Sequence, residues 1–67
     1  MIRLRIDKIL EEKGKSKYWL YKKLTPMSYQ NFNNIFNNNT SGIKFETLER
    51  LSDALEVSFD ELFEKMQ

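Results

Sequence analysis

The stretch SKYWLYKKLTPMSYQNFNNIF, residues 16–36, decides the fold that the sequence predicts. Its first half begins with Ser16, a residue type that caps helix N-termini, and places apolar residues four apart at Leu20 and Leu24. Pro26 ends this segment, because the residue before a proline avoids helical geometry. We therefore predict a short helix over residues 17–24.

The second half of this stretch begins with another cap residue, Ser28, and carries Phe32, Ile35 and Phe36 at the spacing of one helix face. Two short helices joined by a tight turn have the outline of a helix-turn-helix motif. We therefore predict that the helix starting at Ser28 is the second helix of such a motif.

Segments on both sides of the motif also carry apolar residues at helical spacing. One is expected over residues 4–13, and another over residues 45–55. The tail begins with the capping box Ser58-Phe59-Asp60-Glu61, which predicts a fifth helix. The expected fold is an all-α, compact five-helix bundle that forms a single domain over residues 1–67. The core face predicted for the fourth helix consists of Phe45, Leu48, Leu51, Ser52 and Leu55.

The two ends of the chain leave strand alternatives open. Ile2, Leu4 and Ile6 alternate with Arg3 and Arg5 at the strand period of two. A short N-terminal strand is therefore the alternative to a helix that starts at Leu4. The tail, in turn, could fold back as a second strand beside this one instead of forming a helix.

Composition excludes several classes of function. The 67 residues contain no cysteine and no histidine, so disulfides, the usual zinc sites and imidazole acid/base chemistry are absent. A chain this short builds one small core without room for a substrate cavity. We expect no cofactor, no metal and no enzymatic activity. No run approaches the roughly 20 apolar residues of a membrane span and the start is unlike a signal peptide, so we expect a cytoplasmic protein.

The net charge of +1 conceals an uneven distribution along the chain. Residues 1–44 carry nine lysines and arginines against three acids, a net charge of +6. Residues 45–67 carry two against seven, a net charge of −5. A basic part with an acidic end is typical of a protein that binds a polyanion. The alternative is an ordinary solvated surface.

The predicted helix after Ser28 has an unusual outward face, rich in amides and free of charge. Asparagine is a poor helix former, so packing of the apolar face must hold this helix. An asparagine or glutamine amide pairs with the N6 and N7 edge of adenine in the major groove of DNA. We therefore predict base readout that favours A·T-containing sites, with compositional drift as the alternative. The outward residues are Tyr29, Gln30, Asn31, Asn33, Asn34 and Asn37.

Lysines near the motif are candidates for contacts with DNA phosphates. Lys17 and Lys22 lie in the first helix of the motif, together with Lys23, and Lys44 lies just before the fourth helix. Backbone N–H groups at a helix N-terminus, such as the one capped by Ser28, favour the same anions. Gly42, in the loop before Lys44, is predicted to have a positive φ.

Laid out in order, these residues resemble the Cro/lambda-repressor-like (XRE-type) helix-turn-helix transcription regulators. The resemblance covers nearly the whole chain. It is carried by IDKILEEKG (residues 6–14), SKYWL (16–20), MSYQNF (27–32), FETLERL (45–51) and ALEVSFDEL (54–62). The last two segments are the more specific match.

The resemblance implies a set of DNA contacts. Lys17 falls where many members have a glutamine that contacts DNA, and Asn37 falls at an asparagine that often binds phosphate. The implied base contacts are Tyr29, Gln30, Asn31, Asn33 and Asn34, and the implied or predicted phosphate contacts are Lys17, Ser28, Asn37, Lys22 and Lys44.

Two features depart from the family's pattern. Tyr21 stands where the family has a small alanine at the crossing of the two helices, so either the crossing is wider or the ring points out of it. The turn over residues 24–27 is one residue longer than usual.

The sequence thus predicts a transcriptional regulator that binds a specific double-stranded DNA operator as a homodimer. Apolar tail residues are the candidates for the dimer interface: Phe59, Phe63 and Met66. The alternative is a protein-interaction module on the same fold with weak or no DNA binding, in which Tyr18, Trp19 and Tyr29 anchor a partner protein.

Overall fold

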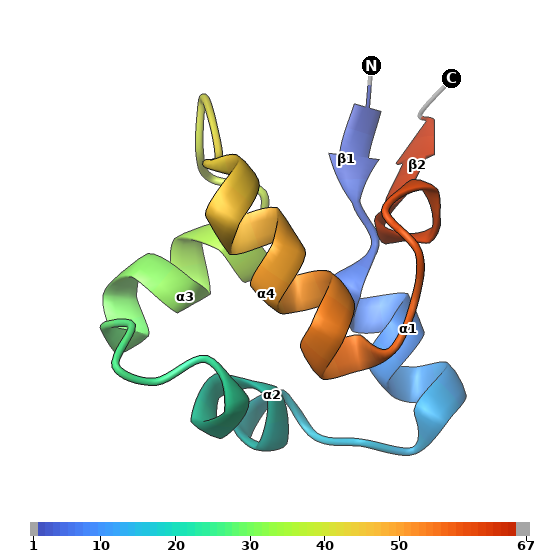
Figure 1. Ribbon diagram of the computed structural model, residues 1–67, viewed down its shortest axis with the longest axis horizontal. Helices are drawn as coiled ribbons and strands as arrows, with labels where there is room; N and C mark the ends of the chain where they lie inside the picture. The colour runs from blue at the N-terminus through green and yellow to red at the C-terminus, as the bar shows by residue number, and fades with distance from the viewer. Residues whose placement is uncertain (1, 66–67) are drawn as a thin grey trace.

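A computed structural model describes residues 2–65 and shows four α-helices, a 3-10 turn and a two-stranded sheet in this part of the chain (Figure 1). No helix among these residues is long and apolar enough to cross a membrane. In chain order the elements are β1 (Ile2–Leu4), α1 (Ile6–Lys13), α2 (Lys17–Lys23), α3 (Tyr29–Phe36), α4 (Phe45–Leu55), η1 (Asp60–Leu62) and β2 (Phe63–Lys65).

The prediction of an all-α, five-helix bundle was wrong at the tail, and at the N-terminus the alternative of a short strand is the one that forms. β1 and β2 pair antiparallel, with Leu4 opposite Phe63, so the two ends lie side by side (Figure 1). The first helix begins at Ile6 and not at Leu4. The tail therefore takes the alternative form, a strand folded back beside the N-terminal strand.

The capping box of the tail forms only by half and does not start an α-helix. The Glu61 N–H donates to the Ser58 carbonyl and not to its hydroxyl. The Ser58 N–H donates to Glu61 Oε1 at 3.1 Å, as a capping box requires. Only the 3-10 turn η1 follows, and it buries Leu62 completely. The Arg5 N–H then donates to the Leu62 carbonyl at 2.9 Å. Pairing with β1 thus replaces the helix that the local pattern favoured.

One apolar core joins the helices, the 3-10 turn and the N-terminal strand. Its buried members are all aliphatic except for Phe32, and no polar or charged residue of the described part is buried. Such a core follows from the apolar stripe that each helix carries at helical spacing. The buried residues are Leu4, Ile6, Ile9, Leu10, Leu20, Leu24, Phe32, Ile35, Leu48, Leu51, Leu55 and Leu62.

Three of the five residues predicted for the core face of α4 are buried; Ser52 is half-buried, and Phe45 differs most from the prediction. Leu48, Leu51 and Leu55 are buried, whereas Phe45 is 83% exposed. Phe45 is the first residue of α4 and lies one turn before Leu48, the first residue of this helix in the core. The helix therefore starts beyond the edge of the core, and its first aromatic ring faces solvent.

Three helices end at a residue in the left-handed conformation. These residues are Gly14 after α1, Asn38 after α3 and Glu56 after α4, with φ values of 65°, 60° and 56°. In each case the next N–H turns back to a carbonyl near the helix end, for example from Asn39 to Asn34 at 2.7 Å. The prediction of a positive φ at Gly42 was wrong, and in this loop Asn38 has the positive φ.

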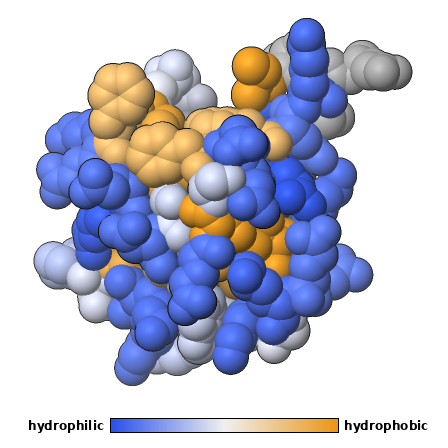
Figure 2. Space-filling view, turned by 45° about the vertical axis from the view of Figure 1, so that its right-hand side comes forward, coloured by the Kyte–Doolittle hydropathy of each residue, from blue (hydrophilic) through white to orange (hydrophobic). Residues whose placement is uncertain are grey.

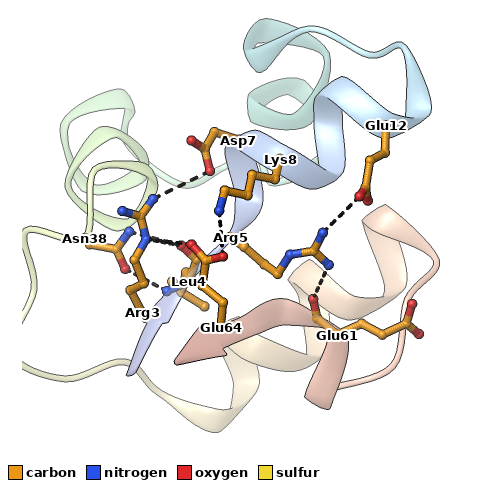
Figure 3. A network of polar contacts seen from close by, with 9 residues as sticks. All are labelled: Arg3, Leu4, Arg5, Asp7, Lys8, Glu12, Asn38, Glu61 and Glu64. Carbon is orange, nitrogen blue, oxygen red and sulfur yellow. Dashed lines mark hydrogen bonds and ion pairs between the residues drawn. The ribbon is translucent and has the colours of Figure 1, made fainter. Parts of the chain in front are cut away.

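Basic residues at the N-terminus are paired with acids (Figure 3). Glu64 of β2 lies 2.7 Å from Lys8 Nζ and 3.2 Å from Arg3 Nε, and Arg5 lies 3.0 Å from Glu12. The charge division along the sequence is therefore partly cancelled in space. The cations that remain for a polyanion are mainly lysines of α2 and of the segments next to it.

Candidate nucleic-acid interface

The two helices of the motif begin at the predicted caps. Ser16 Oγ accepts the Trp19 N–H at 3.0 Å, and Ser28 Oγ accepts the Asn31 N–H at 3.2 Å. Both cap residues have extended backbone geometry, as N-cap residues usually do. The starts of α2 and α3 thus follow directly from two serines.

The Tyr21 ring lies at the crossing of α2 and α3. Its centroid is 5.5 Å from that of Phe32, and it meets the Tyr29 ring edge-on at 5.2 Å. Tyr21 is half-buried and packs against the core. The large side chain therefore fills the crossing with aromatic contacts instead of pointing out of it, at separations typical of favourable aromatic pairs.

The outward face of α3 carries the predicted base-contact residues. Tyr29, Gln30 and Asn31 are exposed in the first turn, and Asn33 and Asn34 are half-buried one turn further on. The opposite face holds the buried residues Phe32 and Ile35. The helix thus presents hydroxyl and amide groups, with no charge of its own, on the side away from the core.

Lys17, a predicted phosphate contact, binds to α3. Its Nζ donates a hydrogen bond to Asn33 Oδ1 at 2.6 Å. The same ammonium lies 4.6 Å from the ring centroid of Phe36 and 5.7 Å from that of Tyr29. The structure therefore brings a candidate phosphate contact together with a candidate base contact, an association that the sequence did not suggest.

The other phosphate candidates lie at the ends of α2, α3 and α4. Lys22 is exposed, with Nζ 5.7 Å from the ring centroid of Tyr18. Asn37 is exposed at the C-cap of α3, and Ser28 is exposed although its oxygen caps the helix. Lys44, the N-cap residue of α4, is also exposed.

Asn31 and Lys44 come together across the loop that joins α3 to α4. Both line one surface pocket, together with Thr40 and Thr47. A predicted base contact and a predicted phosphate contact therefore border the same surface. Bases and phosphates are neighbours in a DNA groove, so this arrangement suits a duplex ligand.

Comparison with known protein families identifies the family of the chain. A model of the Cro/C1-type HTH DNA-binding domain matches residues 5–66, nearly the whole chain. The chain belongs to this family. The expected resemblance is thereby confirmed, and the domain is a DNA-binding one and not an enzyme. No curated protein and no solved structure gives a significant match.

Two further lysines of this Cro/C1-type domain lie over the ring of the same aromatic residue. The ammonium groups of Lys15 and Lys23 lie 5.3 and 5.4 Å from the ring centroid of Trp19. Neither lysine forms an ion pair within residues 2–65. Both therefore add to the basic surface around α2. The sequence had indicated Lys23 as a phosphate candidate, whereas it had given no role to Lys15.

The aromatic anchors considered for a partner protein differ in exposure. Tyr18 and Tyr29 are 63% and 50% exposed, whereas Trp19 packs against the core. Trp19, the residue that would contribute most to a protein interface, is therefore partly buried against the core of the Cro/C1-type domain.

The predicted dimer residues lie on the tail. Phe59 is 46% exposed, and Phe63 of β2 is half-buried against the core. Met66 lies outside the described residues. Figure 2 shows apolar surface gathered toward the end of the molecule where the sheet lies. Among residues 2–65 no group of acids is arranged to hold a metal ion.

Proposed function

We propose that this Cro/C1-type domain is a transcriptional regulator that binds a specific double-stranded DNA operator and inserts α3 into the major groove. The observation that carries the proposal is the exposed first turn of α3, with Gln30 and Asn31 opposite the buried Phe32. A helix fits the major groove, and in helix-turn-helix proteins the N-terminal residues of the second helix contact base edges.

Specificity and affinity come from different residues in this proposal. Tyr29, Gln30 and Asn31 contact base edges directly, with Asn33 and Asn34 one turn further along the groove. Because α3 carries no charge, the charged phosphate contacts are Lys22 of α2 and Lys44 before α4. The two ends of α3 add uncharged contacts, from the N–H groups at Ser28 and from Asn37. Lys15 and Lys23 add to the positive potential.

The operator is bound by two copies of the chain. A single helix-turn-helix unit contacts only a few base pairs, and dimers place two recognition helices about 34 Å apart on successive turns of the groove. Phe59, which is 46% exposed, supplies apolar surface for the contact, and the half-buried Phe63 of the same tail adds to it. Sedimentation equilibrium with and without an operator tests this point. A strict monomer in both conditions contradicts the dimer, and Phe59→Ser is expected to weaken it.

The function itself is tested by binding to a pool of randomised duplexes followed by sequencing of the retained fraction. We expect one enriched motif with two-fold symmetry. We also expect the affinity to fall linearly with salt concentration on a logarithmic scale, because phosphate contacts release counterions. Retention without any enriched motif, or an affinity that salt leaves unchanged, contradicts the proposal.

A further inference from the structure

Lys17 is held on α3 by three interactions. Its Nζ lies 2.6 Å from Asn33 Oδ1, 4.6 Å from the Phe36 centroid and 5.7 Å from the Tyr29 centroid. These three partners follow one another at i, i+4 and i+7 along the helix, so they share one side of it. Lys17 is half-buried, unlike the exposed Lys22 and Lys44. The ammonium group of Lys17 therefore contacts side chains of α3.

The hydrogen bond fixes which atom of the Asn33 amide faces the lysine. An ammonium group has three donors and no acceptor, so the amide atom 2.6 Å away must be the oxygen. The amide is planar, and its NH₂ group therefore points away from Lys17. Within residues 2–65 this nitrogen has no hydrogen-bond partner, and it is not among the buried polar atoms without a partner. The NH₂ group consequently reaches solvent.

We propose that Lys17 is a positioning residue that determines what Asn33 reads in DNA. This inference rests on the proposed function, with α3 in the major groove. A freely rotating asparagine offers a donor and an acceptor together and matches adenine. Asn33 presents its NH₂ donors, because the hydrogen bond to Lys17 turns the amide oxygen toward α2.

The base that fits such a group is guanine. Its N7 and O6 are two neighbouring acceptors in the major groove, whereas adenine places the N6 donor beside N7. A donor facing the adenine N6 amino group would be repelled. Asn33 therefore selects guanine at its base pair, in contrast to the adenine preference expected of the unrestrained amides of Gln30 and Asn31.

Lys17→Met tests this role, because it removes the ammonium and keeps an apolar stem of similar length over Phe36. Duplex selection is carried out with the wild type and with this variant, and the dependence of affinity on salt is measured for both. We expect the preference at one base pair of each half-site to change from guanine to adenine, with the other positions and the salt dependence unchanged.

A direct bond from Lys17 to a DNA phosphate predicts the opposite pattern. The motif then stays the same, affinity falls for all sequences alike, and the slope of log K against log salt becomes shallower by about 0.9 for each phosphate that the variant no longer neutralises. That result overturns the proposal. Lys22→Met, at an exposed lysine of the same helix, is the matched control, and we expect it to behave in this second way.

Asn33→Asp provides a second test that leaves the partner of Lys17 in place. One carboxylate oxygen keeps the lysine, and the other presents an acceptor to the groove. Cytosine offers the N4 donor, so the preference at this base pair is expected to move from guanine to cytosine. Asn33→Asp with an unchanged motif overturns the inference while the proposed function stands. Absence of any motif with the wild-type protein overturns the proposed function and this inference with it.

Discussion

The side-chain amide of Asn38 pairs with the backbone of Leu4, 34 residues earlier in the chain (Figure 3). The Leu4 N–H donates to Asn38 Oδ1 at 2.8 Å, and Asn38 Nδ2 donates to the Leu4 carbonyl at 3.1 Å. Leu4 also lies opposite Phe63 in the sheet. Asn38 thus joins the end of α3 to the strand that closes the fold, and it makes its turn at a φ of 60°.

Replacement of Asn38 is expected to destabilise the domain by two separable effects. Asn38→Gly removes both hydrogen bonds and keeps the left-handed turn, for a loss of about 2 kcal/mol in the free energy of unfolding. Asn38→Ala also places an alanine in the left-handed region, which costs about 1 kcal/mol more. Urea denaturation measures both, and Asn39→Ala at the next, exposed position is the control. Equal stability of all three variants contradicts this role.

Arg50 is expected to hold the turn of the motif. Its Nη2 donates to the carbonyls of Leu24 and Thr25, at 2.7 and 2.9 Å, where α2 ends. Arg50→Ala leaves both carbonyls without this partner and should lower the free energy of unfolding by about 2 kcal/mol. Hydrogen exchange should speed up most at the end of α2. Glu49→Ala, an exposed neighbour on α4, should change neither quantity. A uniform acceleration over all helices in Arg50→Ala contradicts a local role.

Glycine is expected to act in opposite directions at two glutamates, Glu56 just after α4 and Glu49 within it. Glu56 has a φ of 56°, a conformation in which glycine has no steric penalty. Glu56→Gly should therefore raise the free energy of unfolding by about 1 kcal/mol. Glu49 is exposed inside the helix, where Glu49→Gly should lower it by about 1 kcal/mol. Thermal unfolding of the two variants compares them directly, and a loss of stability in both would refute the explanation.

Acid is expected to weaken the turn at Ser58. The Ser58 hydroxyl lowers the pKa of Asp60, and the Ser58 N–H, with the hydroxyl, lowers the pKa of Glu61. The folded state thus binds these protons less readily than the unfolded state. The stabilisation is complete above about pH 5 and is lost as the pH falls through the lowered pKa values. Ser58→Ala should lower the melting temperature at neutral pH, and its difference from the wild type should shrink in acid. A difference that pH leaves unchanged contradicts this linkage.

The helices could be predicted from the sequence because their signals are local. Ser16 and Ser28 cap α2 and α3, and Phe32 and Ile35 are buried as the helical spacing indicates. A cap needs only the next three residues, and an apolar stripe needs only its own helix. These elements also fix where the candidate site lies, on the outward face of α3.

The sheet could not be predicted with the same certainty because it depends on distant residues. The tail carries a capping box that favours a helix, yet Phe63 pairs with Leu4. The alternating pattern near Leu4 indicated one strand, and the pairing of the tail with it stayed an alternative to a fifth helix. The contact between Asn38 and Leu4 could not be predicted for the same reason, since it joins residues 34 positions apart in the chain.

The chemistry of the candidate site was predicted only in part. The outward position of Gln30 and Asn31 follows from helix geometry, but the bond between Lys17 and Asn33 depends on how α2 crosses α3. That crossing is set by the Tyr21 ring against Phe32 and Tyr29, for which the sequence left two arrangements open.

The most direct measurement of whether α3 reads bases is a parallel duplex selection with the wild type and Gln30→Ala. Gln30 is exposed in the first turn of α3, so its loss should leave the fold unchanged. We expect the variant to lose the wild-type preference at one base pair of each half-site and to keep it elsewhere. An identical motif from both proteins, or no motif from either, would contradict recognition of DNA by this helix.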